Sequence, residues 1–342
     1  MAYSGVLDDV KTAVSLGIPE RIPIFAISEP FDVRMSGLTY AEYTHDADKM
    51  ARCRIEAVKT FDYDWSCGWP DDYVEYEPLG VKLKGEENIP LAAYEYPEAS
   101  FNTLKRLKIP DSRRDGRMPG FLEVLKRIKK EFGNTVCLTG RVAAPFSGVG
   151  LLYGVQEALI LPMENPDLLR KTMEFVSELA IYWGKEQIKA GADALWVGDC
   201  VASSGFISPK YYAEFALEPA HKVIMTLRKE NVFLFYHAGE NSLSHLKLMA
   251  ETKPNALSIG GKIDIKKAKE TFSKKNCLLG NMRGIEVMKY GTREDVEKET
   301  SRIMEEGKRG GGYIFNSEEG IPPDVPIENM KVMLETARRH SF

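Results

Sequence analysis

The sequence has few cysteines, little net charge and no long apolar run, and each shortage argues against a class of protein. The five cysteines among 342 residues are odd in number, widely scattered and never in a C-x-x-C pair. This pattern argues against a disulfide framework and against a four-cysteine zinc site. The formal net charge is −4, which argues against nucleic acid as the main partner, because phosphate binding needs a basic surface.

Several sequence signals are also missing. No window approaches the roughly 18 apolar residues that a membrane span needs, and the N-terminus has no basic region followed by an apolar stretch. We therefore expect a cytoplasmic protein with no membrane partner. The chain has no phosphate-binding P-loop, no Gly-x-Ser-x-Gly elbow and no His-Glu-x-x-His helix, which disfavours nucleotide, serine-hydrolase and zinc-peptidase chemistry.

Strand and helix patterns alternate along most of the chain. Eight strands are predicted near residues 22, 63, 135, 194, 232, 256, 277 and 313, with amphipathic helices between the later ones. Because no Gly-x-Gly-x-x-Gly follows the first strand, the pattern favours an α/β fold of the (β/α)8 TIM barrel type over a doubly wound sheet. We expect a single domain over residues 1–342, with an N-terminal helical extension and an irregular excursion at about 79–119.

Residues 232–239 read Val-Phe-Leu-Phe-Tyr-His-Ala-Gly, which predicts a buried strand whose last side chain, His237, emerges at its carboxyl end. In a barrel, the carboxyl ends of the strands share one mouth where chemistry takes place. The alternative is a core histidine held by a backbone carbonyl.

Polar residues follow the other predicted strands and would share that mouth with His237: Arg141, Asp199, Lys262, Asn281 and the pair Glu318–Glu319. Three carboxylates and a histidine at one mouth suggest a metal such as zinc. A proton-transfer cluster and a salt-bridged rim are the alternatives. Glu214 lies on a helix opened by Pro209, where a surface glutamate is the simpler explanation.

Four segments resemble the uroporphyrinogen decarboxylase superfamily, which also contains corrinoid-dependent methyltransferases: residues 207–215, 237–239, 279–282 and 320–329. The decarboxylase branch is expected to carry an arginine-rich loop after the first strand that holds the substrate carboxylates. Here residues 26–34 contain a single arginine, Arg34, and two acids. An anionic tetrapyrrole would be repelled there, which disfavours decarboxylation.

Within this superfamily, zinc methyltransferases that serve thiol acceptors use His-x-Cys and a later cysteine. Gly239 and Glu319 stand at those two cysteine positions. The resemblance to the branch that demethylates methoxylated aromatics implies a zinc site of two acids and a histidine. Asp199, Glu214 and His237 nearly reproduce that order and spacing, and Glu319 is an alternative ligand to Glu214 or an additional one.

The resemblance therefore implies a zinc-dependent methyltransferase that passes a methyl group from a methoxylated aromatic, or another O- or N-methyl donor, to a cob(I)alamin. No Asp-x-His-x-x-Gly motif is present, so a separate corrinoid protein is the expected partner and carrier of the cobalamin. Asp199, His237 and Asn281 are the predicted catalytic residues. The predicted substrate-binding residues are Phe25, Phe31, Trp65, Trp69, Tyr73 and Arg141.

Three alternatives stay open. The chain could transfer methyl groups from methylcobalamin to a thiol or pterin, decarboxylate a porphyrinogen-like acid, or bind corrinoid without catalysis. The oligomeric state is also open, with a homodimer as one alternative.

Overall fold

A curled parallel sheet forms the centre of the computed structural model, which describes residues 3–272 and 274–341. Its strand order is β1-β4-β5-β6-β7-β8-β9, so neighbours in the sheet are also successive along the chain. The seven strands are β1 (Trp65–Cys67), β4 (Cys137–Ala143), β5 (Ala194–Gly198), β6 (Phe233–His237), β7 (Ala256–Ser258), β8 (Cys277–Leu279) and β9 (Tyr313–Ile314).

The predicted first strand is where the structure departs from a regular eight-stranded barrel. Residues 22–27 are joined to the segment after β9 by an isolated bridge between Ile24 and Phe315. Towards β1 there is a backbone hydrogen bond from Asp64 N to Ile24 O. The early Pro23 lacks an N–H group, which limits the ladder that this segment can form. Of the predicted (β/α)8 barrel, the α/β class and a curled sheet of seven parallel strands are confirmed, and the eighth strand is not.

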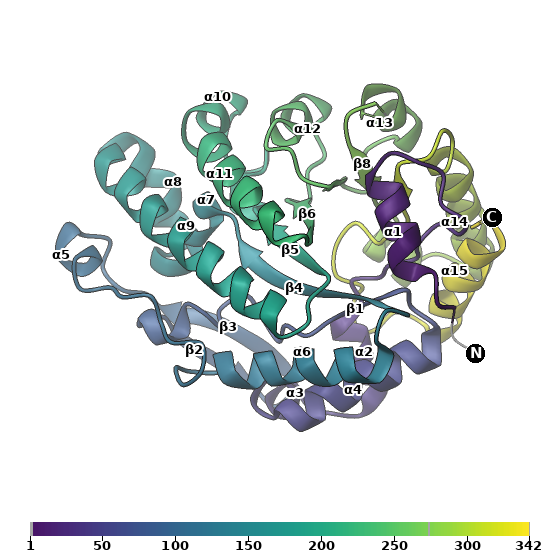
Figure 1. Ribbon diagram of the computed structural model, residues 1–342, viewed down its shortest axis with the longest axis horizontal. Coiled ribbons are helices and arrows are strands. Elements are labelled where there is room, and N and C mark those ends of the chain that lie inside the picture. The colour runs from purple at the N-terminus through teal and green to yellow at the C-terminus, as the bar shows by residue number, and fades with distance from the viewer. Residues whose placement is uncertain (1–2, 273, 342) are drawn as a thin grey trace.

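Helices cover the outside of the sheet, following one another around it in chain order (Figure 1). They are α4 (Ala47–Phe61), α6 (Met118–Phe132), α7 (Pro145–Tyr153), α8 (Val155–Glu164), α9 (Pro166–Lys189), α10 (Pro209–Tyr211), α11 (Leu217–Leu227), α12 (Leu243–Ala250), α13 (Ile265–Phe272), α14 (Arg293–Gly307) and α15 (Ile327–Arg339). The helix start predicted at Pro209 is confirmed, with the side chain of Ser208 as its cap, and the side chain of Asn165 caps α9 in the same way before Pro166.

The interior of the curled sheet is filled by alternate residues of its strands. Trp65, Cys137, Trp196, Phe235 and their neighbours on the other strands form one buried cluster, and α1 (Val6–Val14) adds Val6, Val10 and Ala13 to it. Figure 1 shows α1 lying across one end of the strands. α1 therefore covers the amino-terminal end of the interior cluster.

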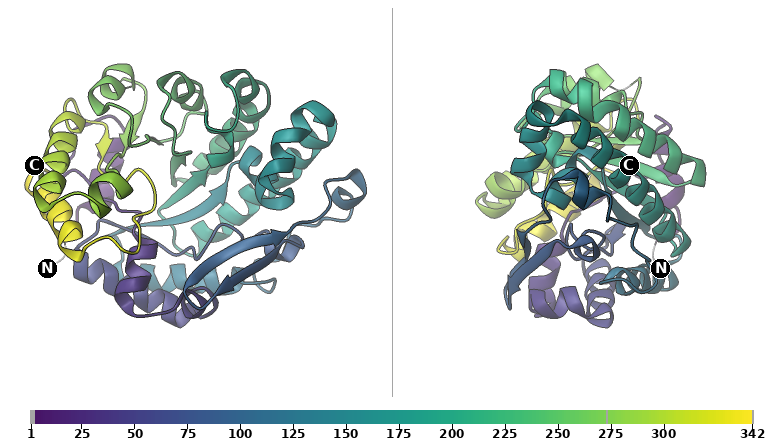
Figure 2. Two further views of the ribbon diagram at one scale, coloured as in Figure 1. Left: turned by 180° about the vertical axis from the view of Figure 1, so that it is seen from behind. Right: turned by 90° about the vertical axis from the view of Figure 1, so that its left-hand side faces the viewer.

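The excursion predicted at about 79–119 contains an antiparallel hairpin of β2 (Lys82–Glu86) and β3 (Ile89–Glu95) and the short helix α5 (Phe101–Leu104). Figure 2 shows this hairpin running along the edge of the molecule beside α2 and α3. Between the predicted first strand and α4, two further helices form, α2 (Glu29–Ser36) and α3 (Tyr40–His45). A capping box of Thr39 and Glu42 starts α3.

In the described part of the chain, no single helix is long and apolar enough to cross a membrane. Only α7 and α8 taken together, across a bend of 112°, have that length and composition.

Candidate metal site at the carboxyl ends of the strands

Strand register decides which residues face the interior near His237. Gly198 on β5 lies opposite His237 on β6. Successive side chains of a strand point to opposite faces. Since Trp196 and Phe235 lie in the interior cluster, Gly198 and His237 also face inward, whereas Tyr236 and Asp199 face the surrounding helices.

Asp199 is therefore not brought to the cluster that includes His237, contrary to the prediction. One carboxylate oxygen accepts hydrogen bonds from Ser147 N at 3.2 Å and Ser147 Oγ at 2.8 Å. The other accepts one from the Tyr236 hydroxyl at 2.5 Å. Burial raises the pKa of Asp199 to about 6, although these hydrogen bonds oppose the shift. Asp199 points outward because successive side chains along a strand alternate between the two faces of the sheet.

Three potential ligands do come together: Cys200, His237 and Glu319, whose ligand atoms all lie within 4.8 Å of one another. Nε2 of His237 is 3.2 Å from a carboxylate oxygen of Glu319. On the other side of the ring, Nδ1 hydrogen-bonds with Ser258 Oγ at 2.9 Å. The Trp196 ring packs on the imidazole with centroids 4.9 Å apart. Ser258 and Trp196 thus fix the ring so that Nε2 faces the cluster.

His237 and Glu319 shift each other's pKa in this cluster. Burial lowers the pKa of His237, but the Glu319 carboxylate and a hydrogen bond with Cys200 outweigh burial and raise it to about 10. Burial raises the pKa of Glu319, and the attraction of His237 reverses this, so that it ends below its ordinary value. The sulfur, nitrogen and oxygen atoms of this cluster are of the kinds that zinc accepts, and His237 must lose its proton to bind it.

The third ligand occupies space that a side chain at residue 239 would need. Gly239 has a φ of +58°, and a Cβ atom added there would lie 2.1 Å from Glu319 Oε1. Only glycine combines this backbone conformation with room for the carboxylate. The Glu319 carboxylate therefore stands in the position where the resemblance places a cysteine side chain.

Glu214 lies outside the cluster, contrary to its prediction as a ligand. It sits in a π-helical turn, Tyr212–Ala216, with an exposed side chain 3.8 Å from Arg170. The simpler interpretation, a surface glutamate, is the one that the structure supports. Between Glu214 and Glu319, the structure brings only Glu319 to His237.

Asn281 also has structural bonds rather than a place in the cluster. Its Nδ2 donates to the carbonyl oxygens of Gly260 and Ile263, both at 2.9 Å, and the side chain is buried. These bonds hold the loop after β7 against the end of β8. The predicted catalytic role of Asn281 stays a prediction.

Arg141 faces the interior from β4, next to Trp196 on β5. Its Nε lies 2.9 Å from a carboxylate oxygen of Asp72, and its Nη1 is 3.8 Å from Glu75. Burial raises the pKa of Glu75 to about 7, and the Arg141 charge only partly offsets this. A Cβ atom added at Gly198 would be 3.8 Å from Arg141 Nη2, so the missing side chain leaves that edge of the guanidinium uncovered by β5.

The five aromatic residues predicted to hold a substrate ring divide into two groups. Phe25 and Trp65 stack within the interior at 5.7 Å, and Phe31 packs against Phe61 in the outer core, all three fully buried. Trp69 and Tyr73 are partly exposed. Because the Trp69 ring lies 6.5 Å from Trp196, which in turn contacts His237, Trp69 is the best placed of the five to contact a ligand at the cluster.

Cys200 is the ligand that the sequence-based prediction missed. It begins a short 3-10 helix, Cys200–Ala202, directly after β5. The signal was present in the alternation itself, since Trp196, Gly198 and Cys200 are spaced by two and the first two face inward.

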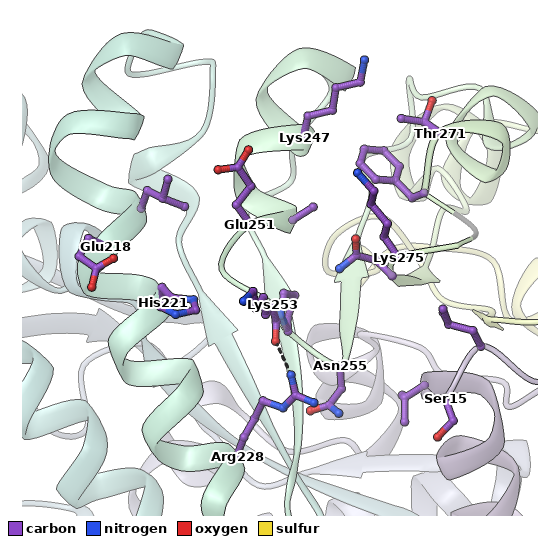
Figure 3. A pocket seen from close by; sticks show the side chains of 17 residues that line it. Ser15, Glu218, His221, Arg228, Lys247, Glu251, Lys253, Asn255, Thr271 and Lys275 are labelled. Carbon is purple, nitrogen blue, oxygen red and sulfur yellow. Dashed lines mark hydrogen bonds between the residues drawn. The ribbon is translucent and has the colours of Figure 1, made fainter.

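A cavity of about 1060 Å³ lies elsewhere. It is lined by the end of α1 and by residues of α11, α12 and α13 near the amino ends of β7 and β8. Figure 3 shows Arg228, Lys247 and Lys275 around it, with Arg228 bonded to the carbonyl oxygen of Lys253. None of Cys200, His237 and Glu319 lines this cavity.

Comparison with known proteins agrees with this architecture. A family model described as uroporphyrinogen decarboxylase matches residues 12–340. The chain belongs to the uroporphyrinogen decarboxylase family. The enzyme of that name from Geobacter sulfurreducens is 26% identical over 314 residues, which are 90% of this chain and 89% of the relative. The enzyme from Rickettsia felis is 24% identical over 315 residues, covering 90% and 88% of the two chains.

Solved structures show that the fold of this uroporphyrinogen decarboxylase family member is shared more widely. A methyltransferase from Methanosarcina mazei superposes with a TM-score of 0.88 at 22% identity, covering 98% of both chains. A B12-independent methionine synthase from Shewanella gives a TM-score of 0.55 at 10% identity over 86% of each chain. At these identities, the likeness is one of fold.

Proposed function

We propose that this protein is a zinc-dependent methyltransferase that takes a methyl group from a methoxylated aromatic, or another O- or N-methyl donor, and passes it to the corrinoid of a separate protein. The observation that carries the proposal is the convergence of Cys200, His237 and Glu319. The near full-length likeness of fold to a methyltransferase adds support.

The cluster fits zinc in kind and in number. Cys200 Sγ, His237 Nε2 and a Glu319 carboxylate oxygen would hold the ion, and three protein ligands leave a fourth position for a substrate. When bound there, zinc would act as a Lewis acid towards an oxygen of the methyl donor. Cys200 would supply one sulfur ligand, from a different place than positions 239 and 319, where the resembling thiol methyltransferases carry cysteine. With one thiolate and one carboxylate, the ligand set is still harder than one with two thiolates, which suits an oxygen donor.

The protein's own residues supply binding and orientation. Ser258 fixes the imidazole of His237 from behind, and the Trp196 ring supports it from the side. Trp69 and Trp196 would offer flat apolar faces to an aromatic methyl donor. Arg141 would add a hydrogen-bond donor at the edge left open by Gly198.

Decarboxylation of a porphyrinogen-like acid is the second candidate, favoured by the names of the curated relatives. The segment after residue 27 opposes it. Arg34 donates to the carbonyl oxygen of Pro323, and Asp32 is paired with the buried Arg54 at 2.7 Å. Burial raises the pKa of the nearby Glu29 to about 8. With Asp32 paired and Glu29 largely protonated at neutral pH, Arg34 is the one charge in residues 26–34 that could hold the carboxylates of an anionic substrate.

One set of assays decides between the two. Purified protein should contain about one zinc ion per chain and demethylate a methoxyarene only when reduced corrinoid protein is added. Cys200→Ala should lose both properties, whereas Cys53→Ala, a buried cysteine on α4, should keep them. Loss of carboxyl groups from uroporphyrinogen by a zinc-free preparation would overturn the proposal in favour of decarboxylation. Methylation of a thiol from methylcobalamin would reverse the direction.

A further inference from the structure

Glu240 is a buried carboxylate close to the cluster but not part of it. Its side chain has no exposed surface, and in the described residues its nearest basic group is His245, with Nε2 at 3.9 Å. Burying a carboxylate without a lysine or arginine partner is costly. A buried carboxylate therefore needs hydrogen bonds that compensate for this cost. The partners in those bonds show which segments the carboxylate connects.

All of the hydrogen bonds to the Glu240 carboxylate come from the loops that carry the proposed ligands. Ser204 donates its N–H at 2.6 Å and its hydroxyl at 2.5 Å. Ser242 donates its N–H at 2.5 Å from the loop after β6. His245 strengthens the link, because its Nε2 bonds to the carbonyl oxygen of Ala202 at 2.8 Å.

These bonds connect the loop after β5 with the loop after β6 beside the cluster. His237 precedes Glu240 by three residues, and Cys200 precedes Ser204 by four. The bond between Glu240 and Ser204 therefore sets how far the Cys200 loop lies from His237. The backbone carbonyl of Glu240 also accepts from Gly260 N at 2.9 Å, which joins the loop after β7 to the same point.

The start of the Cys200 loop is fixed independently. Ser147 Oγ accepts a hydrogen bond from Val201 N at 3.0 Å and donates one to Asp199. The far end is held by the two bonds from the exposed Ser204 to Glu240 and by the bond between Ala202 O and His245.

We infer that Glu240 is a positioning residue that keeps Cys200 within reach of His237 and Glu319. The inference rests on the proposed metal site, because Glu240 would affect zinc binding only through the position of Cys200. Because the bonds from Ser204 N and Ser242 N both need a carboxylate oxygen as acceptor, an amide at residue 240 can keep only one oxygen for them.

The test is the variant Glu240→Gln in the full-length protein. Its zinc dissociation constant should rise about 10- to 100-fold, the usual cost of losing an outer partner of a metal ligand. With cobalt(II) in place of zinc, the thiolate-to-cobalt absorption of the wild type should weaken, which a general loss of stability would not cause. Hydrogen exchange of residues 199–206 should speed up in the metal-free protein.

A matched control lies at the other end of the same strand. Asp193 precedes β5 and is a half-buried, hydrogen-bonded carboxylate, accepting from Lys129 Nζ at 2.6 Å and Leu138 N at 3.0 Å. Asp193→Asn should leave the zinc dissociation constant within about twofold of wild type. Ser204→Ala removes only the hydroxyl bond and should raise the constant less than Glu240→Gln, so it serves if the latter does not fold.

Three results would overturn the inference. If Glu240→Gln or, failing that, Ser204→Ala loosens residues 199–206 but keeps the zinc affinity and the cobalt spectrum of the wild type, Glu240 does not position Cys200. The same conclusion follows if Asp193→Asn weakens zinc as much. A wild-type protein that binds no zinc would instead overturn the proposed function, and this inference with it.

Discussion

The two ends of the curled sheet use the same residue types for different purposes. Towards the amino end, Cys137 and Cys277 are completely buried among aromatic and aliphatic side chains, and burial raises the pKa of Cys277 to about 12. At the carboxyl end, Cys200 is exposed and lies beside His237 and Glu319. Position relative to the end of the strand, rather than residue type, decides which cysteine can act as a ligand.

The difference between the ends also separates stability from chemistry. The amino end is covered by α1, and its interior cluster consists of apolar side chains, so substitutions in that cluster should change the free energy of unfolding. The carboxyl end carries buried charge and loops, so substitutions there should change ligand binding first. Four variants test this separation.

The largest effect is expected for His237→Ala. This variant removes the nitrogen ligand, so the zinc dissociation constant should rise by more than the roughly 100-fold upper cost of losing an outer partner. Metal analysis after gel filtration measures it, with circular dichroism as the control for folding. A folded variant that keeps stoichiometric zinc would contradict the assigned site.

Phe25→Ala should lower the stability of the protein without weakening zinc binding. Phe25 stacks on Trp65 and meets Phe235 edge-on at 5.8 Å, and removing a buried phenylalanine side chain costs about 3–5 kcal/mol. Denaturant unfolding should show this loss, while the zinc affinity under native conditions stays within about twofold. Weaker zinc or donor binding without loss of stability would instead support the predicted role of Phe25 in substrate binding.

Glu75→Gln should change how stability depends on pH. The folded-state pKa of Glu75, about 7, lies above its ordinary value of 4.5. Stability from the protonated carboxyl is therefore full below the ordinary value and is lost as pH rises towards 7. The variant lacks this loss, so it should gain on the wild type by about 1–3 kcal/mol between about pH 5 and pH 8. Unfolding curves at both pH values test this, and a gain that does not grow with pH would count against it.

The smallest effect is expected for Glu214→Gln. An exposed pair such as Glu214 with Arg170 contributes about 0–1 kcal/mol. The zinc affinity should stay within about twofold of wild type and the free energy of unfolding within about 0.5 kcal/mol. A tenfold loss of zinc would restore Glu214 to the ligand set.

Much of the fold was predictable because it depends on local patterns. Alternating apolar strands and capped helices identified the seven strands of the sheet and the starts of α9 and α10. Residues 22–27 could not be assigned from pattern alone, since their apolar character is that of a strand whereas their pairing depends on Pro23 and on distant partners.

The site was predictable in part. His237 follows an unambiguous strand, and Glu319 comes from a segment that resembles relatives, so both were selected and the structure brings them together. Asp199 was selected although it points away from the interior. A shift of one residue along a strand moves a side chain to the opposite face of the sheet. Cys200 was missed because a thiol in a turn after the strand has no pattern of its own until the register is known.

The three residues of the cluster are widely separated along the chain, and this sets the order in which the site can be assembled. Cys200 and His237 follow neighbouring strands, but Glu319 comes only after β9, near the end of the 342 residues. During synthesis, the first two can meet as soon as β6 pairs with β5. The third arrives only when the segment after β9 has joined the sheet, so the complete cluster requires that β5, β6 and β9 all be in place.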